Sequence, residues 1–274
     1  MPDFLRPSFR NPPVAETVLS VQFEPIAGLT NAHLGAFWKA LEGEWTNVAD
    51  APPLDPAFER FGDDLEWELL GLHIRLRTDL SSRLQIRNQA GDRMIQIQNG
   101  RLSFNWLKTA TGDYPRYRAV KPGFQYALAT FQRFIESHEL PGIKPNQWEV
   151  TYVNHLRRGP LWESPDDWSD LLGGFMPRKS LHESIGLESV GGEWHFEIKP
   201  RLGRLHLSLQ HGRVESSEGD ESLIVKMTAR GPIRDSAAAT TAVDAGLDLG
   251  HNVIVDTFKR LPSEDAQRFW EDVS

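Results

Sequence analysis

The side chains best suited to recognise another molecule lie on predicted β-strands that have one apolar and one polar face. In the first half of the chain, amide and arginine residues alternate with apolar residues, so they share one face of a sheet. Amide and guanidinium groups can hydrogen-bond to a protein partner or a small polar ligand, and nearby aromatic rings can add stacking. The predicted binding residues are Gln96, Gln98, Arg101, Asn105, Trp106, Tyr114, Tyr117 and Asn154.

The second half of the chain has a comparable polar face. Its members are Lys199, His206, Ser208, Gln210, Lys226, Thr228 and Arg230. The alternative interpretation is a sheet surface that simply faces water, as antiparallel sheets commonly have. Glu149 fits either interpretation, because a buried carboxylate needs a partner and an arginine of this face could provide it.

Catalytic residues are harder to find than binding residues. The sequence contains no G-x-S-x-G, Walker, G-x-G-x-x-G or H-E-x-x-H motif. The enzymatic alternative is a hydrolase or nuclease with a site formed by Glu149, His155 and nearby arginines. Since no catalytic constellation supports it, we expect a binding protein without enzymatic activity.

We expect neither a metal ion nor a cofactor. The chain has no cysteine, which excludes disulfides, thiolate zinc sites and a cysteine nucleophile. Two histidines on one strand face must be separated by an even number of residues, whereas His206 and His211 are five apart. A solvated sheet face explains His206 instead.

Charge and hydropathy narrow the class of partner. The net charge of −8 argues against broad nucleic-acid binding, which needs a basic surface. A local patch of Arg83, Arg87, Arg116 and Arg118 keeps nucleic acid open as a second alternative. The N-terminal residues have no apolar signal core, and no stretch approaches the roughly 20 apolar residues of a membrane span. We therefore expect a cytoplasmic protein with a protein partner and no membrane association; a homodimer is a further option.

The clearest local signal is a β-hairpin at Asn99-Gly100. This dipeptide favours a type I′ turn with a two-residue loop. The resulting register pairs apolar with apolar and polar with polar residues at every step, as a sheet with one buried face requires. The expected pairs are Gln98 with Arg101, Ile97 with Leu102, Gln96 with Ser103 and Ile95 with Phe104.

The elements around this hairpin predict an α+β fold built from two similar halves, residues 1–142 and 143–274. Each half reads strand, helix, three-stranded meander, helix, with little residue identity between them. The arrangement is typical of helix-grip or TBP-like saddles, with helices on one face of an antiparallel sheet, or of a pseudo-dimer. The first half also contains an acidic, proline-rich excursion at residues 44–64. We expect the halves to form one compact unit.

Five fragments of the sequence carry a family resemblance, and they are PPVAETVLSVQFEP, MIQIQNGRLSFNWLK, YPRY, WEVTYVNHL and NVIVDTFKRL. In this order they resemble a sporadically distributed bacterial family without an assigned molecular function, over nearly the whole chain. The resemblance implies a gene carried on accessory loci, where defence and toxin–antitoxin genes also occur, and a regulatory or antitoxin-like role. It implies no catalytic residue. The matching residues are Pro13, Glu16, Gln98, Asn105, Trp106, Tyr114, Pro115, Tyr117, Glu149, Tyr152 and Asn154.

Overall fold

The computed structural model describes residues 9–61, 82–110, 112–176, 182, 184–213, 221–234 and 239–271. Within these residues the chain is α+β, as predicted, with nine strands and five α-helices. The strands are β1 (Val14–Phe23), β2 (Asn47–Ala51), β3 (Arg83–Arg87), β4 (Arg93–Gln98), β5 (Arg101–Leu107), β6 (Pro145–Arg157), β7 (Gly191–Ile198), β8 (Gly203–Arg213) and β9 (Glu221–Pro232). The helices are α1 (Asn31–Ala40), α2 (Tyr117–Ser137), α3 (Trp168–Leu171), α4 (Ala239–Arg260) and α5 (Glu264–Phe269).

All nine strands form one antiparallel sheet in the order β2-β3-β4-β5-β1-β6-β9-β8-β7. The two strands that open the predicted halves, β1 and β6, lie side by side at its centre. Outward from this central pair, both sides continue with the remaining strands of their own half in reverse chain order. The halves therefore share a sheet, and β1–β6 pairing is the seam between them.

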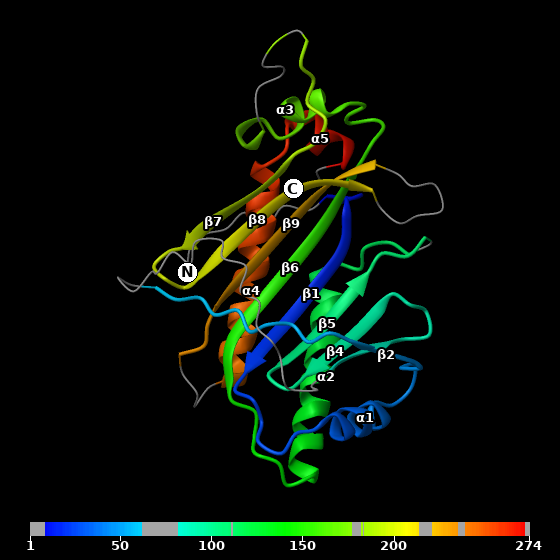
Figure 1. The fold of residues 1–274 in the computed structure, drawn as a ribbon, viewed down its shortest axis with the longest axis vertical. Coiled ribbons are helices and arrows are strands. Elements are labelled where there is room, and N and C mark those ends of the chain that lie inside the picture. Colours follow the sequence, from blue (N-terminus) through cyan, green and yellow to red (C-terminus); the bar gives the residue numbers. More distant parts are fainter. Residues whose placement is uncertain are drawn as a thin grey trace.

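The two long helices lie on the same face of the sheet, behind it in Figure 1. Helix α2 packs on β1 and β5, and α4 packs on β6 and β9. This helix face carries the main apolar core, because the register places one apolar residue of each strand opposite the next. Leu19, Phe104 and Val150 form one such row, and all three are buried. The opposite face, which we call the polar face, carries the amide, hydroxyl and charged residues.

The hairpin at Asn99-Gly100 has the predicted register, pair for pair. Its turn type differs from the prediction, because only Gly100 has a positive φ, of 104°. A type I′ turn requires positive φ at both central residues. The side chain of Asn99 instead bonds both backbone groups of Ile26, at 2.8 Å and 3.1 Å, which ties the turn to the loop after β1. This tertiary contact accounts for the different backbone conformation of Asn99.

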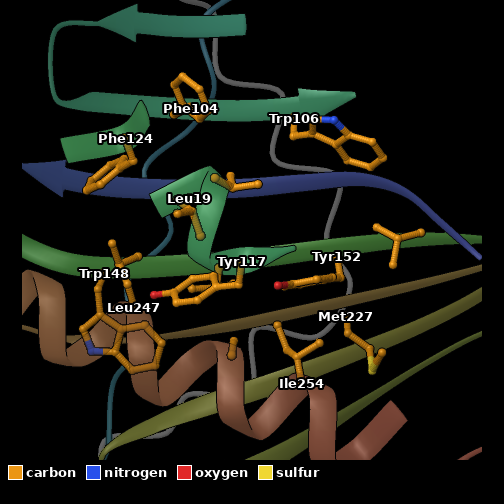
Figure 2. Close-up of a cluster of buried hydrophobic side chains, with 14 of the residues drawn as sticks. Leu19, Phe104, Trp106, Tyr117, Phe124, Trp148, Tyr152, Met227, Leu247 and Ile254 are labelled. Carbon is orange, nitrogen blue, oxygen red and sulfur yellow. The ribbon is translucent and has the colours of Figure 1, made fainter. Parts of the chain in front are cut away.

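Close packing of α4 on the sheet depends on two glycines and one tryptophan. The indole of Trp148 lies between the sheet and α4, with Leu247 and Ile254 in the same layer (Figure 2). A Cβ added to Gly250 would lie 2.8 Å from this indole, and one added to Gly246 would overlap it. These two positions, one helical turn apart, allow the helix backbone to approach the central strands.

Two segments of the first half depart from the sequence prediction. The acidic excursion after α1 contributes an additional edge strand, β2, and then residues 52–61, which cross in front of the polar face (light blue in Figure 1). The end of that predicted excursion, residues 62–64, lies outside the described residues. The YPRY segment, which the sequence did not assign to a helix, reaches α2, whose first residue is Tyr117. Among the residues described, no helix combines the length and apolarity that a membrane span requires.

Candidate functional site

The sheet divides the predicted binding residues between its two faces. Strand register places four of them on the polar face, and these are Gln96, Gln98, Arg101 and Asn105; Glu149, the candidate for catalysis, lies on the same face. The remaining binding candidates lie on the helix face, and these are Trp106, Tyr114, Tyr117 and Asn154. The sequence prediction grouped all eight around one polar sheet face with aromatic rings beside it. In the structure they belong to two separate surfaces.

On the polar face, the predicted amides bond to one another. Gln96 accepts a hydrogen bond from Arg83 at 2.8 Å and donates one to Asn105 at 2.9 Å. Asn105 in turn donates to the carboxylate of Glu16 at 2.6 Å. Hydroxyl pairs extend this layer on the neighbouring strands. The amides of Gln96 and Asn105 thus stabilise the sheet, and they are 9% and 2% exposed.

Glu149 is paired with arginines of the polar face, which is the structural role considered for it from the sequence. Its carboxylate lies 3.2 Å from Arg101 and 3.6 Å from Arg230. His155 lies on the same strand, β6, six residues further on. Six residues of extended strand span roughly 20 Å, so the two side chains are not brought together for joint acid–base chemistry.

A strap formed by residues 52–61 covers part of the polar face. The side-chain amide of Gln98 accepts from the backbone N–H of Leu54 and donates to its carbonyl, both at 2.8 Å. Gln22 makes the same pair of bonds to Ala57, at 3.1 Å and 2.8 Å. Gln147 accepts from the backbone N–H of Glu59 at 2.9 Å and donates to the carbonyl of Ala57. The polar face is therefore occupied by the chain itself at these positions.

The strap is anchored beyond the central strands by the carboxylate of Glu59. It accepts hydrogen bonds from Arg230 Nε at 2.5 Å and His206 Nε2 at 2.6 Å, and it pairs with Arg204. Burial raises the pKa of Glu59, but the bonds and charges of His206 and Arg230 outweigh it, and the pKa falls from 4.5 to about 2. Glu59 is therefore ionised at neutral pH although its side chain is only 2% exposed.

The helix face contains a cleft of about 1460 Å³ between α2, α4 and the central strands. Its polar lining includes Tyr114, Tyr152 and His251, which contact one another, and Asn154, which donates to the carbonyl of Val225. Its apolar wall comes from both sheet and helix, and includes Val14, Trp148, Met227, Ile254, Val255 and Phe258. A largely apolar cavity with a few convergent polar groups is the usual form of a small-molecule site.

A chain of hydrogen bonds runs through the polar part of this cleft. Tyr114 donates to the hydroxyl of Tyr152 at 3.0 Å, and Tyr152 lies 2.9 Å from His251 Nδ1. Burial raises the pKa of Tyr114 and holds that of Tyr152 well above its ordinary value. Both phenols are therefore neutral at physiological pH, so they act as hydrogen-bond donors and acceptors and not as anions.

The two helices are linked over the cleft by side chains. The ring of Tyr117, at the start of α2, stacks on His251 of α4 with centroids 4.0 Å apart and planes at 4°. Tyr117 and Lys121 each donate to Asp248 at 2.8 Å. Burial, followed by the bond and charge of Asp248, raises the pKa of Tyr117, so this link also involves a neutral phenol. These contacts set the separation of the helices.

The four arginines of the proposed nucleic-acid patch do not form one surface. Arg83 belongs to the polar face through its bond to Gln96, whereas Arg116 and Arg118 line the cleft on the helix face. Arg116 also donates to the carbonyl of Arg10 at 3.3 Å. The structure thus separates the patch into two parts that one continuous nucleic-acid strand would not contact together.

Histidines meet at the outer strands of the second half. His195 of β7 and His206 of β8 are register partners, with their Nδ1 atoms 2.6 Å apart. Burial, followed by the charge of His206, lowers the pKa of His195. Within the described ranges, no three His, Asp or Glu side chains are grouped as metal ligands would be.

Several residues of these sites were not predicted from the sequence, and Glu59, Asp248 and His251 are among them. Glu59 lies in a segment without periodicity, so no pattern placed it opposite strands more than 140 residues away in the chain. His251 and Asp248 did have a signal, since they lie three residues apart on a helix and therefore on one side of it. Their helical spacing could not predict that α2 lies beside them.

Comparisons of the chain with protein-family models, with curated protein sequences and with solved structures gave no match.

Proposed function

We propose that this protein is a binding protein without enzymatic activity, whose small-molecule ligand occupies the cleft between α2 and α4. The observation that carries the proposal is the combination of a cleft of about 1460 Å³ with the Tyr114–Tyr152–His251 chain inside it. The apolar wall favours a ligand with an apolar body, and the hydroxyl and imidazole groups favour one polar end that can hydrogen-bond. The ligand class is therefore an amphipathic small molecule.

The position of the cleft supports this proposal. Its floor is the seam of the sheet, where Trp148 and Tyr152 are each 3% exposed, while Arg118 and Gln125 at its rim are exposed. A ligand entering between the helices would place its apolar part against the buried wall and exchange water at the rim. The links from Tyr117 and Lys121 to α4 would hold the walls at a fixed distance, which limits the reorganisation that binding requires.

The biological setting of this binding is proposed from the sequence alone. The family resemblance favours a regulatory or defence-associated component of an accessory locus. The cysteine-free composition favours the cytoplasm as its location.

A fluorescent amphipathic probe, 1-anilinonaphthalene-8-sulfonate, tests the cleft. The variant Ala242→Phe places a ring at a half-buried position of the lining, whereas Ala119→Phe places the same ring on the exposed side of α2, outside the cleft. We expect saturable one-to-one binding to the wild type and to Ala119→Phe, and at least tenfold weaker binding to Ala242→Phe. Circular dichroism confirms that each variant is folded.

Two outcomes would count against the proposal. The wild type could fail to bind the probe in a saturable manner, or both phenylalanine variants could bind it as the wild type does. In the second case the probe would occupy a surface other than the cleft.

A further inference from the structure

The strap is held almost entirely through groups that any peptide possesses. Gln98, Gln22 and Gln147 bond to its backbone N–H and C=O groups at Leu54, Ala57 and Glu59, and none of these bonds involves a strap side chain. Paired hydrogen bonds between a glutamine side chain and the backbone recognise an extended segment whatever its side chains are. Three glutamines, on β4, β1 and β6, therefore form a row across the sheet that hydrogen-bonds to the backbone of the strap.

The most buried side chain of the strap is a carboxylate bound by charged residues of the polar face. Arg204, His206 and Arg230 surround Glu59, and its side chain is 2% exposed. By contrast, two large apolar side chains of the strap are exposed, Leu54 at 37% and Phe58 at 50%, whereas Phe61 lies against the guanidinium of Arg204. Burial of apolar surface thus contributes little at Leu54 and Phe58, and polar recognition holds the strap in place.

The charges of the polar face would favour an acidic segment if the strap were absent. Among the described residues, Glu149 forms ion pairs with Arg101 and Arg230, and Glu197 is the register partner of Arg204. Arg204 and Arg230 form further ion pairs with Glu59, which would be lost if the strap left. A partner that supplies an extended segment with one carboxylate would reproduce the backbone bonds to the three glutamines and the contacts of Glu59.

We propose that the polar face is a recognition groove for an extended acidic peptide segment of a partner protein. In the structure, residues 54–59 occupy this groove as an internal ligand, and a partner segment with a glutamate at the position of Glu59 displaces them. The groove is on the opposite face of the sheet from the cleft, so this proposal does not depend on the proposed small-molecule ligand.

The experiment compares two full-length variants that each remove one carboxylate charge. Glu59→Gln weakens the internal ligand, whereas Asp50→Asn alters an exposed residue of β2 beside the strap. The probe is a fluorescein-labelled peptide with the sequence of residues 52–61, PPLDPAFERF, and its matched partner has Gln in place of Glu. Fluorescence anisotropy measures the affinity of each peptide for each protein.

We expect Glu59→Gln to bind the Glu peptide at least tenfold more tightly than the Gln peptide. The wild type and Asp50→Asn should bind the Glu peptide at least tenfold more weakly than Glu59→Gln does, because their own strap competes. Equal affinities for the two peptides, or no binding to folded Glu59→Gln, would overturn the proposal.

Hydrogen exchange on the wild type gives a second readout that does not require the variant to fold. The backbone amides of Ala57 and Glu59 donate to Gln22 and Gln147, so they are protected while the strap is bound. Excess Glu peptide should accelerate their exchange at least fivefold, while the Gln peptide should not. Unchanged exchange with excess Glu peptide would show that the strap is a permanent cover and would contradict the proposal.

Discussion

Glu59 shows how the environment of a single side chain determines its role. A carboxylate with 2% exposure would ordinarily be protonated or excluded from such a position. Here two arginines and a histidine donate to it, and their combined effect exceeds the cost of burial. The same three donors would be left without compensation if the carboxylate were removed. Glu59 is therefore the residue through which the strap and the second half of the sheet depend on each other.

The lowered pKa of Glu59 predicts a pH dependence of stability. Its pKa is about 2 in the folded protein and 4.5 as the ordinary value, so its contribution is complete above the unfolded pKa and is lost as pH falls toward about 2. The shift corresponds to about 3 kcal/mol. We expect Glu59→Gln to be less stable than the wild type at about pH 6, and this difference to fall by more than half at about pH 3.

Urea denaturation of both proteins at the two pH values measures this difference. Asp50→Asn serves as the control, because its unfolding free energy should follow that of the wild type at both pH values. Curves for Glu59→Gln and the wild type that stay parallel with pH would show that Glu59 does not titrate with the assigned shift.

At the scale of single elements, the contact between α4 and Trp148 is set by glycine. Gly246 and Gly250 lie over the indole, so the helix backbone packs directly on the Trp148 ring. This closeness places His251 and Asp248 within reach of Tyr152 and Tyr117. The contacts of His251 and Asp248 inside the cleft therefore depend on the absence of a side chain at Gly246 and Gly250.

We predict that Gly246→Ala destabilises the protein by roughly 1–3 kcal/mol, because the added methyl group overlaps the Trp148 indole and forces α4 outward. Gly35→Ala in α1 is the matched control, since nothing lies within 4 Å of its added methyl group. That change should stabilise the protein by about 0.5–1 kcal/mol through helix propensity. Chemical denaturation distinguishes the two, and a neutral Gly246→Ala would contradict the packing described.

The elements that the sequence predicts well are those fixed by local patterns. The hairpin register, for example, followed from the alternation of apolar and polar residues along its two strands. The strap and the turn type at Asn99 were not predictable in this way. Both depend on contacts between residues distant in the chain, such as Glu59 with Arg230, and no local periodicity reports such contacts.

The same limit applies to the candidate sites. Alternation along β4 and β5 correctly grouped Gln96, Gln98 and Asn105 on one face. It did not reveal that Gln98 is bonded to the strap and that Gln96 and Asn105 are bonded to each other. Residue type and the alternation along a strand indicate which face of the sheet a side chain occupies. Whether that side chain is available to a ligand depends on whether another segment of the chain already binds it.

At the scale of the whole molecule, the β1–β6 seam makes the two halves interdependent. Each inner strand pairs on one side with its own half and on the other side with the opposite half. The strap strengthens this dependence, because a segment of the first half is anchored on β8 and β9 of the second. The first half contributes β1 to β5 and the second half contributes β6 to β9, and all nine belong to one sheet.

This interdependence predicts that neither half folds alone. We expect residues 1–142 and 143–274, expressed separately, to be unfolded or aggregated, because each would expose one full edge of its inner strand. Mixing the two fragments during refolding should restore the circular dichroism spectrum of the intact chain. A fragment that gives a cooperative unfolding transition by itself would show that the seam joins two independent domains.

The seam also governs the order in which a nascent chain can complete its sheet. Strand β1 ends at Phe23, and its neighbour β6 begins only at Pro145. At the ordinary rate of translation, the edge of β1 that pairs with β6 stays unpaired for on the order of 10 s. During this interval, β6 of a second chain translated from the same messenger RNA can pair with β1 of the first chain. The product would be a domain-swapped dimer. Helix α4 follows all nine described strands in the chain and packs on β6 and β9. Its docking would therefore stabilise whichever β1–β6 pairing, within one chain or between two, had formed before it was synthesised.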